Sequence, residues 1–171
     1  MEVDSVATAV RWALAYLGCV RAMVARPAVV LDIDGTILVN TADGHAKCVH
    51  HMGVLVAACV SAKIAIFFVT ARPDTDDNRK HTERQLARCG VNKHETLYMM
   101  PPRHEYLRYK FRARQDIISK GWNVLLAVGD QFADVSRREN LGLADDRLYV
   151  GQIGDGGSFA IKLPSEFGGQ V

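Results

Sequence analysis

The sequence predicts an α/β fold: a doubly wound parallel sheet in three layers, built as a single domain over residues 1–171. Short apolar runs rich in β-branched residues alternate along the chain with helical patterns. Strands are expected at 28–31, 64–69, 96–99 and 123–128, and helices at 45–62, 74–89 and 106–120. Strands that alternate with helices pair in parallel and are covered by helices on both faces. With 171 residues, 49% of them hydrophobic, the chain is long enough to bury one such core.

The segment before this core, residues 1–26, is predicted to form an amphipathic helix, with the core itself at 28–150. Its apolar residues recur at steps of three and four, namely at Val3, Val6, Val10, Leu14, Leu17, Val20 and Val24. The apolar run Trp12–Val20 also resembles the centre of a signal peptide, but Glu2 and Asp4 make the preceding residues acidic where a signal is basic. The run is shorter than the roughly 20 residues that cross a bilayer. We therefore expect a packed helix and no membrane partner.

Proline and glycine mark most of the element boundaries. Pro27 ends the first helix, and Pro73 begins the helix that runs to Cys89. Gly90 and Gly121 stand directly after predicted helices, where glycine is a preferred terminating residue. The remaining segments are assigned as turns at 34–44, a fifth strand at 147–150, a glycine-rich connection at 151–157 and a last edge strand at 158–163.

Polar residues collect where the predicted strands end. Asp32 and Asp34 follow the first strand, Thr70 ends the second, and Asp130 follows the fourth, while Lys110 in a later helix could reach the same edge. Ligands bind at the carboxyl ends of the strands in open α/β sheets. Each residue alone is more often a turn, cap or surface residue. Their combination at one sheet edge predicts a functional site.

The residue types in this site favour phosphoryl transfer. Clustered carboxylates raise one another's pKa values, and a divalent cation removes that repulsion. Oxygen ligands favour Mg²⁺ over zinc. Beside such a metal, Asp32 is a candidate nucleophile toward phosphorus and Asp34 a candidate acid and base. Thr70 and Lys110 could hold phosphoryl oxygens, and Gly35 would permit close backbone approach. We therefore predict a magnesium-dependent phosphatase that acts through an aspartyl-phosphate.

The same residues resemble the haloacid dehalogenase (HAD) superfamily over about residues 28–150. Four motifs match in order: Asp32-Ile33-Asp34-Gly35-Thr36-Ile37, Val69-Thr70, Lys110, and Gly129-Asp130-Gln131-Phe132-Ala133-Asp134. The resemblance implies a Rossmann-like core with Asp32 as nucleophile and metal ligand. Asp34 would be the acid and base and would bind the metal through its carbonyl oxygen. Asp130 would bind the metal directly, and Asp134 would join the site, with a bridging water as one option.

Asp34 favours a phosphatase over a dehalogenase within that superfamily, because the dehalogenases lack this aspartate. The run Gly129–Asp134, together with Lys162-Leu163-Pro164, resembles the acid-phosphatase branch, which is similar to subfamily IIIB. Gly35, Thr36 and Arg72 are the expected substrate contacts.

Little chain is left for a cap over this site, so we expect an open site. The stretch 72–114 carries eleven Lys and Arg against six Asp and Glu, with tyrosines interleaved. A solvent-exposed helical face explains such a stretch. The more specific alternative is a surface that binds nucleic acid or a phosphoprotein. A polynucleotide or phosphoprotein phosphatase and a non-catalytic binding module therefore stay open as alternatives. A homo-oligomer in which the N-terminal helix covers the site stays open as well.

The cysteines indicate a reducing compartment. Four of them, Cys19, Cys48, Cys59 and Cys89, lie far apart without a CxxC pair, which argues against a zinc site and a disulfide framework. We interpret them as reduced thiols and expect a cytoplasmic protein. The net charge of +2 is too small to indicate a nucleic-acid or membrane partner by itself.

Overall fold

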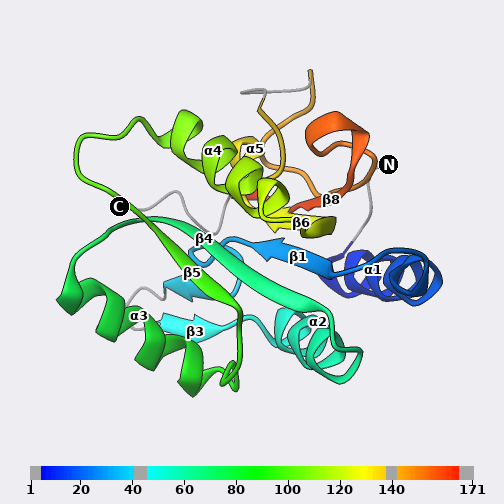
Figure 1. The fold of residues 1–171 in the computed structure, drawn as a ribbon, viewed down its shortest axis with the longest axis horizontal. Helices are drawn as coiled ribbons and strands as arrows, with labels where there is room; N and C mark the ends of the chain where they lie inside the picture. The colour runs from blue at the N-terminus through cyan, green and yellow to red at the C-terminus, as the bar shows by residue number, and fades with distance from the viewer. Residues whose placement is uncertain (1–4, 41–45, 138–141, 166–171) are drawn as a thin grey trace.

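The computed structural model describes residues 5–40, 46–137 and 142–165, and in these residues a six-stranded sheet forms the centre of the molecule (Figure 1). The strand order is β5-β4-β1-β6-β8-β7. The strands are β1 (Pro27–Leu31), β4 (Ala65–Pro73), β5 (Thr96–Met100), β6 (Asn123–Gly129), β7 (Tyr149–Gly151) and β8 (Phe159–Lys162). All neighbours pair in parallel except β7, which is antiparallel to β8. The predicted α/β fold class is confirmed.

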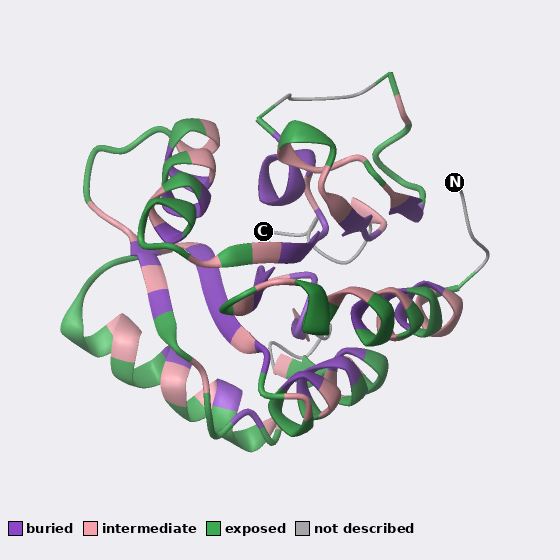
Figure 2. Ribbon diagram, turned by 45° about the vertical axis from the view of Figure 1, so that its right-hand side comes forward, coloured by how far each residue is buried: buried purple, intermediate pink, exposed green. Residues whose placement is uncertain are grey.

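Helices cover both faces of this sheet (Figure 1). On one face lie α1 (Val6–Val20), α2 (His50–Ser61) and α3 (Asp76–Arg88); on the other lie α4 (Tyr106–Ser119) and the short α5 (Phe132–Val135). Alternate residues of β1 and β4 face the two sides of the sheet: Leu31 and Phe68 pack in the core under α1 and α2, while Val30 and Phe67 pack against α4. Figure 2 shows buried strands between helices whose outer faces are exposed.

The first helix packs on the core, as its apolar stripe predicts. Ser5 caps it by accepting a hydrogen bond from the Thr8 N–H at 3.2 Å, and its buried residues are Ala9, Val10, Ala13 and Leu17. The helix is shorter than expected, because a 3₁₀ turn at Arg21–Met23 precedes an extended Val24. Val3 of the predicted stripe, with Glu2 and Asp4, lies outside the described residues. Among the described residues no helix has the length and apolar composition needed to cross a bilayer.

Two short strands replace part of the turns and helix predicted for residues 34–62. β2 (Leu38–Asn40) and β3 (Ala46–Cys48) pair as an antiparallel hairpin, with Leu38 opposite Cys48. Residues 41–45, which include the rest of the predicted turns and the predicted start of the helix, lie outside the described residues. The helix begins at His50, because Val49 before it is still extended. Between β1 and α2 the described chain holds this hairpin and no separate cap domain.

The last strand was predicted at the edge of the sheet, and this position is wrong. β8 lies between β6 and β7 and runs parallel to β6, with Lys162 opposite Gly129. The physical reason is burial. Ala160, Ile161 and Lys162 are all fully buried, as expected for a strand that has a neighbouring strand on each side. The antiparallel β7 forms the edge instead.

The prediction of four reduced cysteines is also wrong. Cys48 at the end of β3 and Cys89 at the end of α3 form a disulfide across 41 positions of the sequence, with their Cα atoms 5.5 Å apart. Neither residue has a nearby cysteine in the sequence, so their spacing gave no sign of the pair. Cys19 and Cys59 are free thiols.

Candidate active site

Three buried aspartates, Asp32, Asp130 and Asp134, form an acidic cluster at the carboxyl edge of the sheet. Asp32 follows β1, Asp130 follows β6, and Asp134 lies on α5 directly after it. One carboxylate oxygen from each lies within 4.8 Å of the others. The two strands are neighbours in the sheet, and their parallel pairing brings the loops that follow them together.

Two glycines allow these carboxylates to approach one another. Gly35 has a φ of +73°, and a Cβ atom there would lie 2.5 Å from the carboxylate carbon of Asp130. A Cβ atom on Gly129 would lie 2.0 Å from the Cβ of Asp134. Any other residue at either position would displace a carboxylate of the cluster. The glycine in each motif therefore has a steric reason at this site.

Lys110 brings the one positive charge that contacts the cluster in the described residues. It lies on α4 and is fully buried. Its Nζ contacts Oδ1 of Asp32, lies 2.7 Å from Oδ1 of Asp134, and donates a hydrogen bond to the carbonyl of Val69 at 2.7 Å. Burial alone would lower the pKa of Lys110, but the carboxylates of Asp134 and Asp32 outweigh it and raise that pKa. Lys110 is therefore a charged ammonium shared by two carboxylates.

The cluster holds more negative charge than Lys110 balances. Burial raises the pKa of Asp32 well above its usual value, the Asp134 charge adds to this, and Lys110 opposes it. Burial and the Asp134 charge raise the pKa of Asp130 to about 6. Among the described residues no ion pair joins Asp130 to a cation, and its Oδ2 accepts a long hydrogen bond of 3.3 Å from the Gln131 amide. A set of oxygen ligands with excess negative charge fits a hard divalent cation such as Mg²⁺.

Asp34 lies outside this cluster, although only one residue separates it from Asp32. Its carboxylate receives two hydrogen bonds from Arg72, 2.8 Å from Nε and 2.7 Å from Nη2. The same guanidinium donates to Thr82 Oγ1 at 2.9 Å and Gln85 Oε1 at 2.6 Å, both on α3. Arg72, expected at the substrate, is thus bound to the expected acid and base. Thr82 and Gln85 were not predicted, because a Thr and a Gln on a polar helix give no sequence signal.

The two predicted threonines are buried. Thr70 lies inside β4, which continues to Pro73, and its Oγ1 accepts the N–H of Arg72 at 3.2 Å. Thr36 is fully buried, and its hydroxyl has no hydrogen-bond partner among the described residues. The substrate contact expected of Thr36 stays a prediction, as do the roles of Thr70 and Gly35.

Tyr106 is a site residue that the sequence did not single out. It begins α4, and its hydroxyl donates a hydrogen bond of 3.3 Å to Oδ1 of Asp134. Its ring lies 5.6 Å from the Nζ of Lys110. Burial, with the charges of the three aspartates, raises the pKa of Tyr106 and keeps it a neutral donor. Its spacing of four residues from Lys110 on one helix is the signal that could have identified it.

Five of the eleven basic residues in 72–114 are bound within the protein. The pairs are Arg72 with Asp34, Arg79 with Asp74, Arg108 with Glu105, Lys110 with Asp32, and Arg114 with Asp155. Lys110 and Arg114 are moreover buried. The stretch is therefore no continuous surface of unpaired positive charge.

Comparison with known proteins identifies one family. The family model "HAD superfamily, subfamily IIIB (Acid phosphatase)" matches residues 40–165, so the match begins after the Asp32–Thr36 run. No curated protein matches the chain.

Solved structures with a similar fold include the class C acid phosphatase from Bacillus anthracis, both in one structure without a named ligand and in another with tungstate bound. Each has a TM-score of 0.60 at 16% sequence identity, covering 75% of this chain and 62% of that one. At this identity the likeness concerns the fold, and the chain spans less than two thirds of those proteins.

Proposed function

The chain belongs to subfamily IIIB (acid phosphatase) of the HAD superfamily, and from that premise we propose that it hydrolyses phosphomonoesters with Mg²⁺. The observation that carries the proposal is the acidic cluster of three buried carboxylates, of which only Asp32 and Asp134 contact the single lysine, Lys110. Such a site favours a divalent cation and a phosphoryl group, which together offset charge that Lys110 alone leaves unbalanced.

In the proposed reaction Asp32 attacks phosphorus, and the bond to the leaving oxygen breaks as the aspartyl-phosphate forms. Asp34 gives its proton to the leaving oxygen. Asp34 then accepts a proton from the water that attacks the aspartyl-phosphate, which releases inorganic phosphate and restores Asp32. Lys110 and Thr70 hold phosphoryl oxygens through these steps.

The metal would be held by Asp32, Asp130 and Asp134, with the backbone carbonyl of Asp34 as a further oxygen. When bound, Mg²⁺ supplies positive charge beside the phosphoryl oxygens. The raised pKa values of Asp32 and Asp130 support this assignment, because both carboxylates gain most from a nearby cation.

Arg72 has to release Asp34 for this chemistry. Both oxygens of Asp34 accept a hydrogen bond from the guanidinium, whereas the acid role needs one of them to face the leaving oxygen instead. We expect the substrate phosphate to compete for Arg72, because a guanidinium binds phosphate and carboxylate with the same fork of donors. Thr82 and Gln85 hold Arg72 in reach of both partners.

The alternatives receive less support. A polymeric substrate is not favoured, because several of the basic residues expected to bind it are already paired. The cytoplasmic location rested on reduced cysteines, and the Cys48–Cys89 disulfide is instead typical of oxidising compartments. A homo-oligomer stays a prediction.

The covalent intermediate gives the direct test. We expect wild-type protein, mixed with a radiolabelled phosphomonoester and Mg²⁺ and quenched in acid, to retain label that hydroxylamine removes, as an acyl phosphate does. Asp32→Asn should retain none. Asp116→Asn is the matched control, because Asp116 lies on the surface in an ion pair with Lys120. Equal labelling of Asp32→Asn and wild type would contradict the proposal.

A further inference from the structure

The helix that carries Asp134 is too short to satisfy its backbone carbonyls with hydrogen bonds inside the helix. α5 spans only Phe132–Val135, so most of its carbonyls lack a partner within the helix. Arg114 on α4 supplies one: its Nη1 donates to the carbonyls of Ala133 at 2.6 Å and Asp134 at 2.9 Å. The Arg114 side chain is only 3% exposed, so these bonds are formed away from water.

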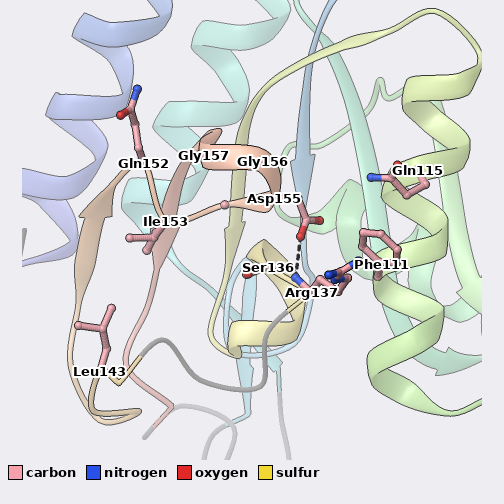
Figure 3. A pocket seen from close by; sticks show the side chains of 11 residues that line it. Phe111, Gln115, Ser136, Arg137, Leu143, Gln152, Ile153, Asp155, Gly156 and Gly157 are labelled. Carbon is pink, nitrogen blue, oxygen red and sulfur yellow. Dashed lines mark hydrogen bonds between the residues drawn. The ribbon is translucent and has the colours of Figure 1, made fainter.

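Asp155 extends this support to the residues after α5. Its Oδ2 accepts a hydrogen bond from Arg114 Nε at 2.8 Å. Its Oδ1 accepts the backbone N–H of Arg137 at 2.6 Å, the bond drawn as a dashed line in Figure 3. One carboxylate therefore links the α4 side chain to the chain that leaves α5. We call Arg114 and Asp155 the clamp. It holds residues 133–137 on both sides of Asp134.

The clamp borders a pocket that is separate from the acidic cluster. Asp155, Arg137 and Phe111 are among the residues that line this cavity of about 610 Å³ (Figure 3). None of the three clustered aspartates lines it. Asp155 therefore borders open space on one side, but its isosteric replacement still removes the charge partner of the buried Arg114, so the folding of each variant has to be measured beside its metal affinity.

A purely stabilising role explains the clamp poorly. A buried ion pair gains little net stability, because desolvation offsets the attraction between its charges. Arg114 also leaves its Nη2 without a hydrogen-bond partner among the described residues, which adds to that cost. What the pair does achieve is to fix the backbone position of a residue whose carboxylate faces Asp32 and Asp130.

We propose that Arg114 and Asp155 are positioning residues that set the metal affinity of the acidic cluster through Asp134. The proposal rests on the proposed function, since it requires a metal at the cluster. The Asp134 side chain is oriented by Lys110 and by the Gln131 N–H at 2.9 Å, while the clamp holds its backbone. Mg²⁺ demands near-ideal octahedral geometry, so a small shift of α5 weakens its binding.

The test measures Mg²⁺ binding directly, by titration calorimetry of the substrate-free protein. Arg114→Met and Asp155→Asn should each raise the Kd for Mg²⁺ by about 10–100-fold, the usual cost of losing an outer-shell partner. Arg114→Lys should fall between them and wild type, because an ammonium can reach a carbonyl but lacks the separate Nε donor that binds Asp155. In phosphatase assays the variants should need more Mg²⁺ for half-maximal rate yet approach the wild-type rate at saturating Mg²⁺.

Arg26→Met is the matched control. Arg26 also donates to a helix-end carbonyl, that of Lys120 at 2.7 Å, but at the far end of α4 from Lys110. It should lower the melting temperature and leave the Kd for Mg²⁺ unchanged. Folded Arg114→Met with the wild-type Kd overturns the proposal. If circular dichroism shows Arg114→Met to be unfolded, Asp155→Asn decides, and an unchanged Kd there overturns it. Wild-type protein that binds no Mg²⁺ overturns the proposed function and the clamp together.

Discussion

Asp32 and Asp34 stand one residue apart and occupy opposite environments. The Asp32 side chain is 7% exposed and meets a buried lysine shared with Asp134, whereas the Asp34 side chain is 43% exposed and meets a forked arginine. We call these the inner and outer carboxylates. A lysine is a compact charge that two carboxylates can share, while the arginine fork occupies both oxygens of one. Under the proposed function, this short loop assigns two identical groups to metal chemistry and to proton transfer.

The loop achieves this division by winding around one carbonyl. The carbonyl of Ile33 accepts the N–H groups of Thr36, Ile37 and Leu38, at 3.2, 2.9 and 2.9 Å. Ile33 itself is fully buried between the two aspartates. The left-handed Gly35 then turns the chain into β2. A regular strand would have pointed both carboxylates to one side, and this turn separates them.

Loss of the inner carboxylate should have the largest effect. Asp32→Asn removes the nucleophile, so the rate on an aryl phosphate with Mg²⁺ should fall by about 10⁴-fold or more. Steady-state phosphate release measures it, with Asp116→Asn expected to match wild type. A variant that keeps a tenth of the activity would mean that Asp32 only binds the metal.

Loss of the outer carboxylate should cost less. Asp34→Asn removes proton transfer but leaves the nucleophile, so kcat should fall by about 10²–10⁴-fold. The loss should shrink for substrates whose leaving group needs no proton, such as a dinitrophenyl phosphate. An equal fall in kcat for all leaving groups would show that Asp34 is not the acid, and the inner and outer carboxylates would then not differ in the way proposed.

The partner of the outer carboxylate should matter less again. Arg72→Lys keeps the charge but loses the fork, and we expect kcat/KM to fall by about 10–100-fold, the cost of one or two charge-assisted hydrogen bonds. Arg79→Lys is the matched control, because Arg79 pairs with Asp74 on the surface. In a double-mutant cycle, Asp34→Asn should reduce the effect of Arg72→Lys, since the two act as a unit. Additive effects would show that Arg72 works independently of Asp34.

The smallest effect concerns the stability of the metal-free protein. The pKa of Asp130 is about 6 in the folded state against a usual 3.8, so the folded state holds its proton more tightly than the unfolded chain. That stability is present at low pH and is lost as the pH rises through about 6. We expect the melting temperature in EDTA to be several degrees higher at pH 5 than at pH 7.5, at roughly 2–4 °C per kcal/mol.

Addition of Mg²⁺ at pH 7.5 should recover that stability, and Asp130→Asn should reduce the pH dependence, with the remainder due to Asp32, whose pKa is also raised. A metal-free melting temperature that rises between pH 5 and 7.5 would contradict the raised pKa and the excess negative charge of the inner site.

The sequence was informative where chemistry follows strand ends. The sequence predicts that Asp32, Asp130 and Lys110 lie close together, because the carboxyl ends of parallel strands lie at one edge of the sheet. The order of the strands in the sheet cannot be predicted from the sequence in the same way. β8 and β7 are adjacent in the sequence, and nothing local to either segment says which of them pairs with β6. Three-residue strands such as β2 and β3 are also too short to show an alternating pattern.

Pairs of charged side chains were the hardest feature to predict. Arg72 and Asp34 are 38 residues apart, and Arg114 and Asp155 are 41 apart. An arginine on a basic helix is indistinguishable in sequence from a solvated one, so Arg114 was included in a surface stretch although it is buried. Such partners depend on how α4 sits against the loops, which only the packed structure specifies.

The disulfide encloses the partner of the outer carboxylate in a covalent ring, while both carboxylates lie outside it. Cys48 and Cys89 close a ring that contains Arg72 and its α3 anchors, Thr82 and Gln85. The acidic cluster and Lys110 lie outside that ring in the chain. A loop of this length restricts the unfolded ensemble by about 4 kcal/mol in the chain-entropy treatment. Reduction would therefore lower the stability of the fold by about that amount, and the residues that leave the ring include Arg72 and both of its α3 partners.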